Sequence, residues 1–315
     1  MSEHRLVGLE PDNLLAFLAL LGLLRALETA RPAWAPRAYW DVARQPLRPV
    51  LVLREAVGED AVAAAANEGI LALAAGYRFD RNDLNYPRSE AVQLLRDPPE
   101  GMNAEVLDAL MSDGALREDG TVRPTPFCFL FGQGHQHFLS RLGDVPRGRL
   151  PSRLATRKKA PDLNDPALIA RTMFQPWTRE ELTDGFRWDP VEDRRYALRA
   201  ADPSGDPGGM QHGANRLATI GLSCLPGVPI RRHSEMRFLN AGTRYGSDGA
   251  IEVGWPVWTA AARLAGICGL LAHPSVQGAT AITEKMRALG VTQLYRARRI
   301  SVGKFFNIER AERVA

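Results

Sequence analysis

An apolar stretch near the start of the sequence constrains the fold more than any other feature. Nearly every position from 13 to 30 is apolar, and residues 14–24 form an unbroken apolar run of 11 residues. This run is too short to cross a bilayer, which takes about 20 residues, and its apolar side chains face every direction. The stretch therefore predicts a buried helix, and Gly22 would let another backbone approach it closely. We expect an α+β fold, with mixed helices and antiparallel strands around this buried N-terminal helix.

Alternating and helical patterns predict further elements along the chain. Expected strands are 38–41, 49–54, 127–131, 230–238 and 250–253. Expected helices are 59–75, 89–96, 103–111, 135–142, 165–174, 212–221 and 258–271, and Asp12 is expected to cap the first helix. The chain then divides into an N-terminal α+β half (1–145), a basic linker (146–162) and a C-terminal α+β half (163–315), with a single domain as the alternative.

The overall composition indicates an ordinary globular protein in a reducing compartment. Hydrophobic residues make up 45% of the chain and charged residues 24%. Three cysteines stand far apart, which favours reduced thiols in the core. The first residues include acids and no small-residue cleavage site, so we expect no signal peptide. The sequence predicts a cytoplasmic protein without a membrane partner.

Arginine dominates the basic residues of the chain. Of 40 lysines and arginines only four are lysines, while the net charge is +4. Arginine binds phosphate through two parallel hydrogen bonds and stacks on bases, which favours contact with nucleic acid. A GC-rich genome, which encodes basic residues with arginine codons, is the alternative explanation.

The predicted linker holds the densest group of basic residues. Residues 145–161 contain no acid. Like charges so close together repel one another unless an anion is bound, which predicts a nucleic-acid contact. An exposed, proline-limited linker is the alternative. The candidate binding residues are Arg147, Arg149, Arg153, Arg157, Lys158 and Lys159.

A glycine-rich bridge, residues 240–249, is expected to form a long, mobile hairpin between two strands. Asn240 could contact a base edge with two hydrogen bonds, and Arg244 and Tyr245 could enter a groove or stack on a base. A loop tip without function is the alternative. We expect this loop to recognise a short duplex motif.

The tail, residues 285–308, again lacks acids and interleaves basic with aromatic residues. This combination suits RNA or single-stranded DNA, because aromatic rings stack on bases while arginines follow the phosphates. An edge strand whose charges prevent aggregation is the alternative. The candidate binding residues here are Arg296, Arg298, Arg299 and Lys304.

Catalytic motifs are missing from the sequence, so we expect no enzyme, no metal and no other cofactor. The sequence contains no nucleophile elbow, P-loop or zinc ligand set. The alternative is a small metal- or nucleotide-dependent enzyme. It would use the glycine loop from Gly132 to Gly134, which precedes a predicted helix, together with His135 and His137.

Residues 186–221 combine three patterns that together predict a docking element. Phe186 and Trp188 alternate with charged residues as in a half-buried strand, and residues 196–200 repeat the alternation. A loop rich in glycine and proline follows, and a short helix with a face of small residues ends the stretch. We expect an antiparallel hairpin, a flexible loop and a helix that together bind a partner.

The same stretch carries a resemblance to a known group of proteins. FRWDPVEDRRYALRAADPS followed by HGANRLATIGL resembles a pattern in proteins of type I-G (formerly I-U) CRISPR loci. The pattern occurs in the large-subunit group of the RNA-guided Cascade complex and in a related group tied to the helicase-nuclease. The stretches LVGLEPDNLLAFLALLGLLRALE and TPFCFLFGQGHQHFLSRL agree with this resemblance.

The resemblance implies a non-catalytic subunit of a CRISPR surveillance complex. Such a subunit would bind target DNA near the flanking motif and help to recruit the helicase-nuclease. The implied partners are guide RNA, target double-stranded DNA, the Cascade backbone subunits and the helicase-nuclease. With 315 residues the chain is short for a full large subunit, which implies a compact variant or the helicase-associated relative.

Overall fold

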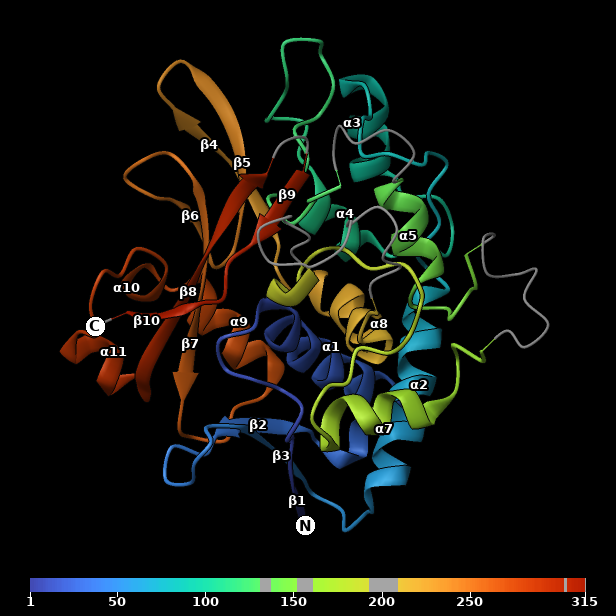
Figure 1. Ribbon diagram of the computed structural model, residues 1–315. Coiled ribbons are helices and arrows are strands. Elements are labelled where there is room, and N and C mark those ends of the chain that lie inside the picture. Colours follow the sequence, from blue (N-terminus) through green and yellow to red (C-terminus); the bar gives the residue numbers. More distant parts are fainter. Residues whose placement is uncertain (131–136, 152–160, 193–208, 303–304, 315) are drawn as a thin grey trace, which may run out of the picture.

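The computed structural model describes residues 1–130, 137–151, 161–192, 209–302 and 305–314. Helix α1 (Leu14–Ala30) lies in the middle of the molecule, and its apolar side chains are buried on every face (Figure 1). Asn13 caps this helix, because its Oδ1 atom accepts hydrogen bonds from the backbone N–H groups of Leu15 and Ala16. The prediction of Asp12 as the cap is wrong, since its carboxylate binds Arg310 at 2.9 Å.

The remaining elements of the described residues alternate between helices and short antiparallel strands, which confirms the predicted α+β class. The other helices are α2 (Glu59–Ala74), α3 (Arg88–Arg96), α4 (Ala104–Leu110), α5 (Phe138–Asp144), α7 (Pro166–Phe174), α8 (His212–Leu222), α9 (Leu264–Ala272), α10 (Pro274–Gln277) and α11 (Glu284–Ala288), with 3-10 turns η1 (Pro32–Trp34) and η2 (Pro190–Glu192). The strands are β1 (Ser2–Arg5), β2 (Arg37–Trp40), β3 (Pro49–Leu53), β4 (Gly227–Arg232), β5 (Glu235–Asn240), β6 (Thr243–Tyr245), β7 (Ile251–Trp258), β8 (Val291–Val302), β9 (Phe305–Ile308) and β10 (Glu312–Val314).

Helices α1 and α8 cross with their backbones in contact. A Cβ atom added to Gly22 would overlap the carbonyl of Leu217, and one added to Gly221 would overlap the carbonyl of Leu18. The close approach predicted from Gly22 is therefore confirmed. Helix α8 also packs against α2 and α7 and is buried over its whole length, including its single arginine, Arg216.

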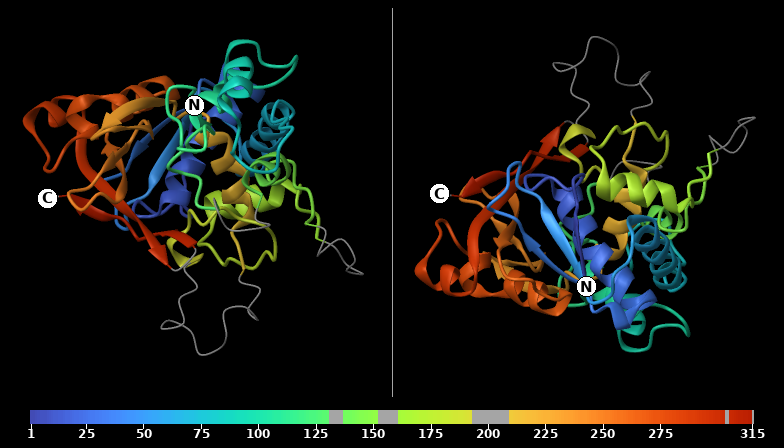
Figure 2. Two further views of the ribbon diagram at one scale, coloured as in Figure 1. Left: turned by 90° about the horizontal axis from the view of Figure 1, so that it is seen from above. Right: turned by 90° about the horizontal axis from the view of Figure 1, so that it is seen from below.

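A five-stranded antiparallel sheet packs against the other side of α1 (Figures 1 and 2). Its main path is β10-β8-β7-β6, and β9 pairs with the far end of β8. Phe17 of α1 stacks on Trp255 of β7 with 5.3 Å between ring centres. A three-stranded sheet, β1-β3-β2, adjoins it, because Trp258 donates a hydrogen bond to the carbonyl of Ala38 at 2.7 Å.

The predicted strand at residues 186–188 does not form. Phe186 and Trp188 are both fully buried and stack on each other with ring centres 4.4 Å apart. The Trp188 carbonyl accepts from the N–H of Leu15, and its indole donates to the carbonyl of Phe127. These aromatics therefore belong to the core, and because α8 is buried as well, neither of them offers the expected docking surface. The second predicted strand (196–200) lies outside the described residues.

Three other boundaries differ from the prediction. Residues 127–130 form buried turns instead of a strand. The expected strand at 230–238 is the hairpin of β4 and β5, which turns at His233, where φ is 53°. Residues 258–263 do not begin a helix, because Trp258 ends β7 and α9 starts only at Leu264.

The two predicted halves share one hydrophobic core. Its buried residues run from Leu6 to Ala311 and include side chains from both sides of the predicted linker. Within the described ranges, no helix is both long and apolar enough to cross a bilayer.

Candidate nucleic-acid interface

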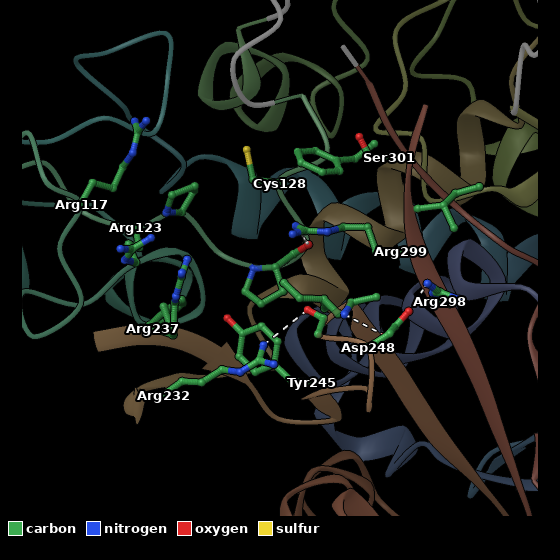
Figure 3. Close-up of a pocket in the computed structure, with 18 residues that line it drawn as sticks. Arg117, Arg123, Cys128, Arg232, Arg237, Tyr245, Asp248, Arg298, Arg299 and Ser301 are labelled. Atoms are coloured by element: carbon green, nitrogen blue, oxygen red, sulfur yellow. Dashed lines mark hydrogen bonds and ion pairs between the residues drawn. The ribbon is translucent and has the colours of Figure 1, made fainter. Parts of the chain in front are cut away.

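A pocket with a volume of about 740 Å³ opens between four segments from three regions of the sequence (Figure 3). These are the turn region 117–128, the β4–β5 hairpin, the β6–β7 turn (245–251) and the β8–β9 region. Among the described residues that line the pocket, Asp248 is the single acid, against six arginines. They are Arg117, Arg123, Arg232, Arg237, Arg298 and Arg299.

Antiparallel pairing holds these arginines in position. On the β4–β5 hairpin Ile230 pairs with Arg237, which fixes the arginines of both strands beside the pocket. Strand β8 pairs with β7 on one side and with β9 on the other, and carries Arg298 and Arg299 into the pocket from the opposite wall (Figure 3). The arginines thus come from rigid strands as well as from a turn.

Two of the arginines lie over aromatic rings. The Arg232 guanidinium is 4.0 Å from the ring centre of Tyr245, and that of Arg299 is 4.4 Å from the ring centre of Phe306. A guanidinium at this distance is attracted to the ring face. Stacking on a ring does not use the edge N–H groups, so those that do not already donate to a backbone carbonyl can bind phosphate oxygens.

The six arginines differ in how their charges are compensated. Arg123 and Arg237 share the carboxylate of Glu235, at 2.8 and 2.6 Å, and Arg298 forms an ion pair with Asp248. Arg117 lies 3.8 Å from Asp119. The other two arginines of the pocket, Arg232 and Arg299, form no ion pair with a carboxylate of the described residues.

Arg299 is half-buried in the pocket wall. Its Nη1 atom donates to the carbonyl of Pro126 at 3.0 Å. Burial lowers the pKa of this guanidinium, because the surrounding protein stabilises the charge less well than water does. A bound phosphate would supply the missing negative charge.

Three of the sequence-predicted residues, Tyr245, Arg298 and Arg299, meet in this pocket. The prediction missed Arg117, Arg123, Arg232 and Arg237. The stretch RRHSEMR at 231–237 carries three arginines against one glutamate and could have indicated the hairpin.

Asn240 does not reach a base edge, contrary to the prediction. Its side chain is 1% exposed, and its amide donates to the carbonyls of Ala109 at 2.7 Å and Leu225 at 2.6 Å. Its Oδ1 atom accepts from the hydroxyl of Thr125. This residue therefore stabilises the fold, and the segment expected to be one loop consists of a turn at 241–242, strand β6 and a turn at 246–249.

Arg244 and Arg296 are engaged within the protein as well. The Arg244 Nε atom donates to Glu252 at 2.8 Å, and Arg296 lies 3.5 Å from the same carboxylate. Both arginines also donate to the carbonyl of Ala279. The alternative of an edge strand holds for part of the tail: β8 has partners on both sides at residues 294–296, whereas β9 pairs with β8 alone among the described strands.

The basic segment 145–161 is described only in part. Arg147 is half-buried and donates to the carbonyls of Gly143 and Tyr77, and burial lowers its pKa. Arg149 is exposed and pairs with Asp144 at 3.1 Å. Both line a second hollow, of about 620 Å³. The remaining candidates, Arg153, Arg157, Lys158, Lys159 and Lys304, lie outside the described residues.

The residues of the alternative enzyme prediction are mostly not described. Gly132, Gly134 and His135 lie outside the described ranges. The Nδ1 atom of His137 lies 3.5 Å from a carboxylate oxygen of Asp83. In the part of the chain that the structure describes, no three histidine, cysteine or acidic side chains group together as metal ligands would.

The chain was compared with known proteins at three levels. No protein-family model, no curated protein and no solved structure matches it.

Proposed function

We propose that this chain is a non-catalytic subunit of an RNA-guided CRISPR surveillance complex of type I-G, and that the arginine-lined pocket binds nucleic acid. The single observation that supports this most is the convergence of six arginines with the rings of Tyr245 and Phe306 from three regions of the sequence. Arginines without a binding role would be spread over the surface and would not gather beside aromatic rings in one pocket. Arginine clusters with aromatic rings are typical of sites that hold phosphates and bases.

The chemistry of the pocket suits contact with phosphates and lacks one common means of reading sequence. Its described lining contains no asparagine or glutamine, the side chains that pair with adenine edges. In RNA-guided complexes base pairing reads the sequence, while the protein binds backbones and checks a short flanking motif. A subunit whose main site binds phosphates and stacks on bases suits that division.

The partners in this proposal are guide RNA, target double-stranded DNA, the Cascade backbone subunits and the helicase-nuclease, all acting in the cytoplasm. The chain would bind target DNA near the flanking motif and help to recruit the helicase-nuclease. Asn240 and Arg244 are not assigned to the flanking motif, because both side chains are held inside the protein.

Purification of the tagged chain from its native host, followed by RNA sequencing and mass spectrometry, tests this function. We expect guide RNAs and Cascade subunits to co-purify with the parent protein. A chain carrying Arg232→Ala and Arg237→Ala should retain the protein partners and lose part of the nucleic acid. Recovery of the chain without guide RNA and without any Cascade subunit would contradict the proposal.

A further inference from the structure

The arginine-lined pocket also indicates which form of nucleic acid it accepts, an inference that rests on the proposed function. Its lining includes two kinds of group that a nucleotide can contact, guanidinium groups without a carboxylate partner among the described residues and aromatic rings. Arg232 and Arg299 are the two arginines whose charge no carboxylate of the described residues compensates, and each lies on a ring. The pocket therefore offers two phosphate-binding positions, each beside an aromatic ring.

The aromatic rings distinguish a single strand from a duplex. In a duplex the bases stack on one another, so an aromatic side chain inside a pocket finds no free base face. In a single strand each base has an accessible face, and stacking on an aromatic ring stabilises the complex whatever the base is. Tyr245 and Phe306 can contribute this stacking only to unpaired nucleotides.

The size and shape of the pocket agree with a short segment of chain. A volume of about 740 Å³ falls in the range of small-ligand pockets, roughly 300–1,000 Å³. Arg117, Arg123 and Arg237 line one wall, and Arg298 and Arg299 line the other (Figure 3). Arg123 and Arg237 share the carboxylate of Glu235, and Arg298 pairs with Asp248. Because their charges are partly compensated, these three arginines would attract the strand over a distance more than they would bind individual phosphates.

We propose that the pocket binds unpaired nucleotides of a single-stranded RNA or DNA, with one base stacked on Tyr245 and phosphates bound by Arg232 and Arg299. In an RNA-guided complex the sources of such a strand are an unpaired end of the guide and the DNA strand that the guide displaces. Both offer the same chemistry, so ribose and deoxyribose probes distinguish them.

The test uses the full chain and fluorescence anisotropy. The probes are oligouridylate and oligothymidylate of about ten nucleotides, a length within the usual site size, and a DNA duplex of the same length. We expect the parent protein to bind a single strand at least about tenfold more tightly than the duplex, since stacking contributes this much per base. The stronger of the two single-stranded probes identifies the source of the strand.

Two substitutions of one residue examine the stacking directly. Tyr245→Ala should weaken single-strand binding about tenfold or more, whereas Tyr245→Phe should retain it, because the ring is kept and only the hydroxyl is lost. Arg54→Ala, an exposed arginine outside the pocket, is the matched control and should bind like the parent. If Tyr245→Ala does not fold, Tyr245→Leu keeps the apolar bulk while removing the aromatic face.

The possible outcomes separate this inference from the proposed function. Equal affinity for duplex and single strand, with no loss in Tyr245→Ala, would overturn the inference and leave a nucleic-acid-binding subunit. Binding of a free mononucleotide as tight as that of the oligonucleotides would also overturn it. A chain that binds no probe and brings down no guide RNA from its host would contradict both.

Discussion

The guanidinium of Arg232, at the end of β4, lies 4.0 Å from the ring centre of Tyr245, at the end of β6. The two residues come from separate antiparallel pairs, β4–β5 and β6–β7, so the contact joins two hairpins at the mouth of one pocket. The contact places a cation beside an aromatic ring. A nucleotide can use both, because its phosphate binds the cation and its base stacks on the ring.

Removal of the Arg232 charge should change the response of binding to salt. Each phosphate contact on a single strand contributes about 0.7 to the slope of log affinity against log salt concentration. We expect Arg232→Ala to reduce that slope by about this amount, with little change in the circular dichroism spectrum. Titrations of oligothymidylate between low and moderate salt measure it, and Arg54→Ala should keep the parent slope. An unchanged slope in Arg232→Ala would remove this residue from the interface.

Substitution of Gly22 should destabilise the protein strongly. A Cβ atom there would overlap the carbonyl of Leu217, and backbone atoms of two packed helices cannot move apart without loss of core contacts. We expect Gly22→Ala to lower the free energy of unfolding by about 2 kcal/mol or more. Urea denaturation followed by circular dichroism measures the change.

A matched control for that substitution lies on α9. Gly269 is exposed, and a Cβ atom added there meets nothing within 4 Å. Gly269→Ala should therefore leave stability unchanged or raise it by up to about 1 kcal/mol, through the better helix propensity of alanine. If Gly22→Ala destabilised the protein no more than Gly269→Ala does, helices α1 and α8 would not be in backbone contact.

Loss of the Asn240 side chain should affect stability and not nucleic-acid binding. Asn240→Ala leaves the carbonyls of Ala109 and Leu225 and the Thr125 hydroxyl without a buried partner. We expect a loss on the order of 3 kcal/mol in the free energy of unfolding. Below the melting temperature, the folded variant should bind oligonucleotides as the parent does. A loss of binding without a loss of stability would show instead that Asn240 contacts the nucleic acid.

His212 should make the protein less stable in mild acid. Burial, together with the nearby Arg216 charge, lowers the pKa of this histidine from 6.5 to about 3. Between these values the unfolded chain binds a proton that the folded protein does not, so stability is full above pH 6.5 and falls as the pH decreases. The contribution is up to about 1.4 kcal/mol per pH unit.

Urea denaturation at pH 7 and at pH 5.5 measures this effect. The parent protein should lose more stability between the two pH values than His212→Gln, which has no proton to bind in either state. Equal losses in the two proteins would show that His212 is protonated in the fold.

The sequence predicted the central part of the fold because local patterns determine it. The apolar run of α1 requires burial, and Gly22 marked the point where α8 crosses. The expected helix at 165–174 matches α7, which Asp165 caps. The strand predicted from Phe186 and Trp188 was wrong. Alternation with charged residues also occurs in an irregular segment, and here both aromatic side chains enter the core.

The pocket could be predicted only in part, since pairing between distant segments creates it. Tyr245, Arg298 and Arg299 stood out as basic and aromatic residues in the sequence, but nothing local distinguished them from Arg244 and Arg296. The difference is Glu252 of β7, which lies between β6 and β8 and forms ion pairs with Arg244 and Arg296. Which arginine meets a carboxylate depends on strand register, and the sequence pattern does not reveal it.

Photo-crosslinking tests the central claim most directly, because it reports which residues a bound strand touches. Oligonucleotides that carry 5-iodouracil are bound to the full chain, irradiated and digested, and the cross-linked peptides are identified by mass spectrometry. We predict cross-links to the peptides that contain Tyr245 and Phe306, and their loss from the Tyr245 peptide in Tyr245→Ala. Cross-links confined to residues 145–161, with none in the four pocket segments, would contradict the assignment of the pocket as the nucleic-acid site.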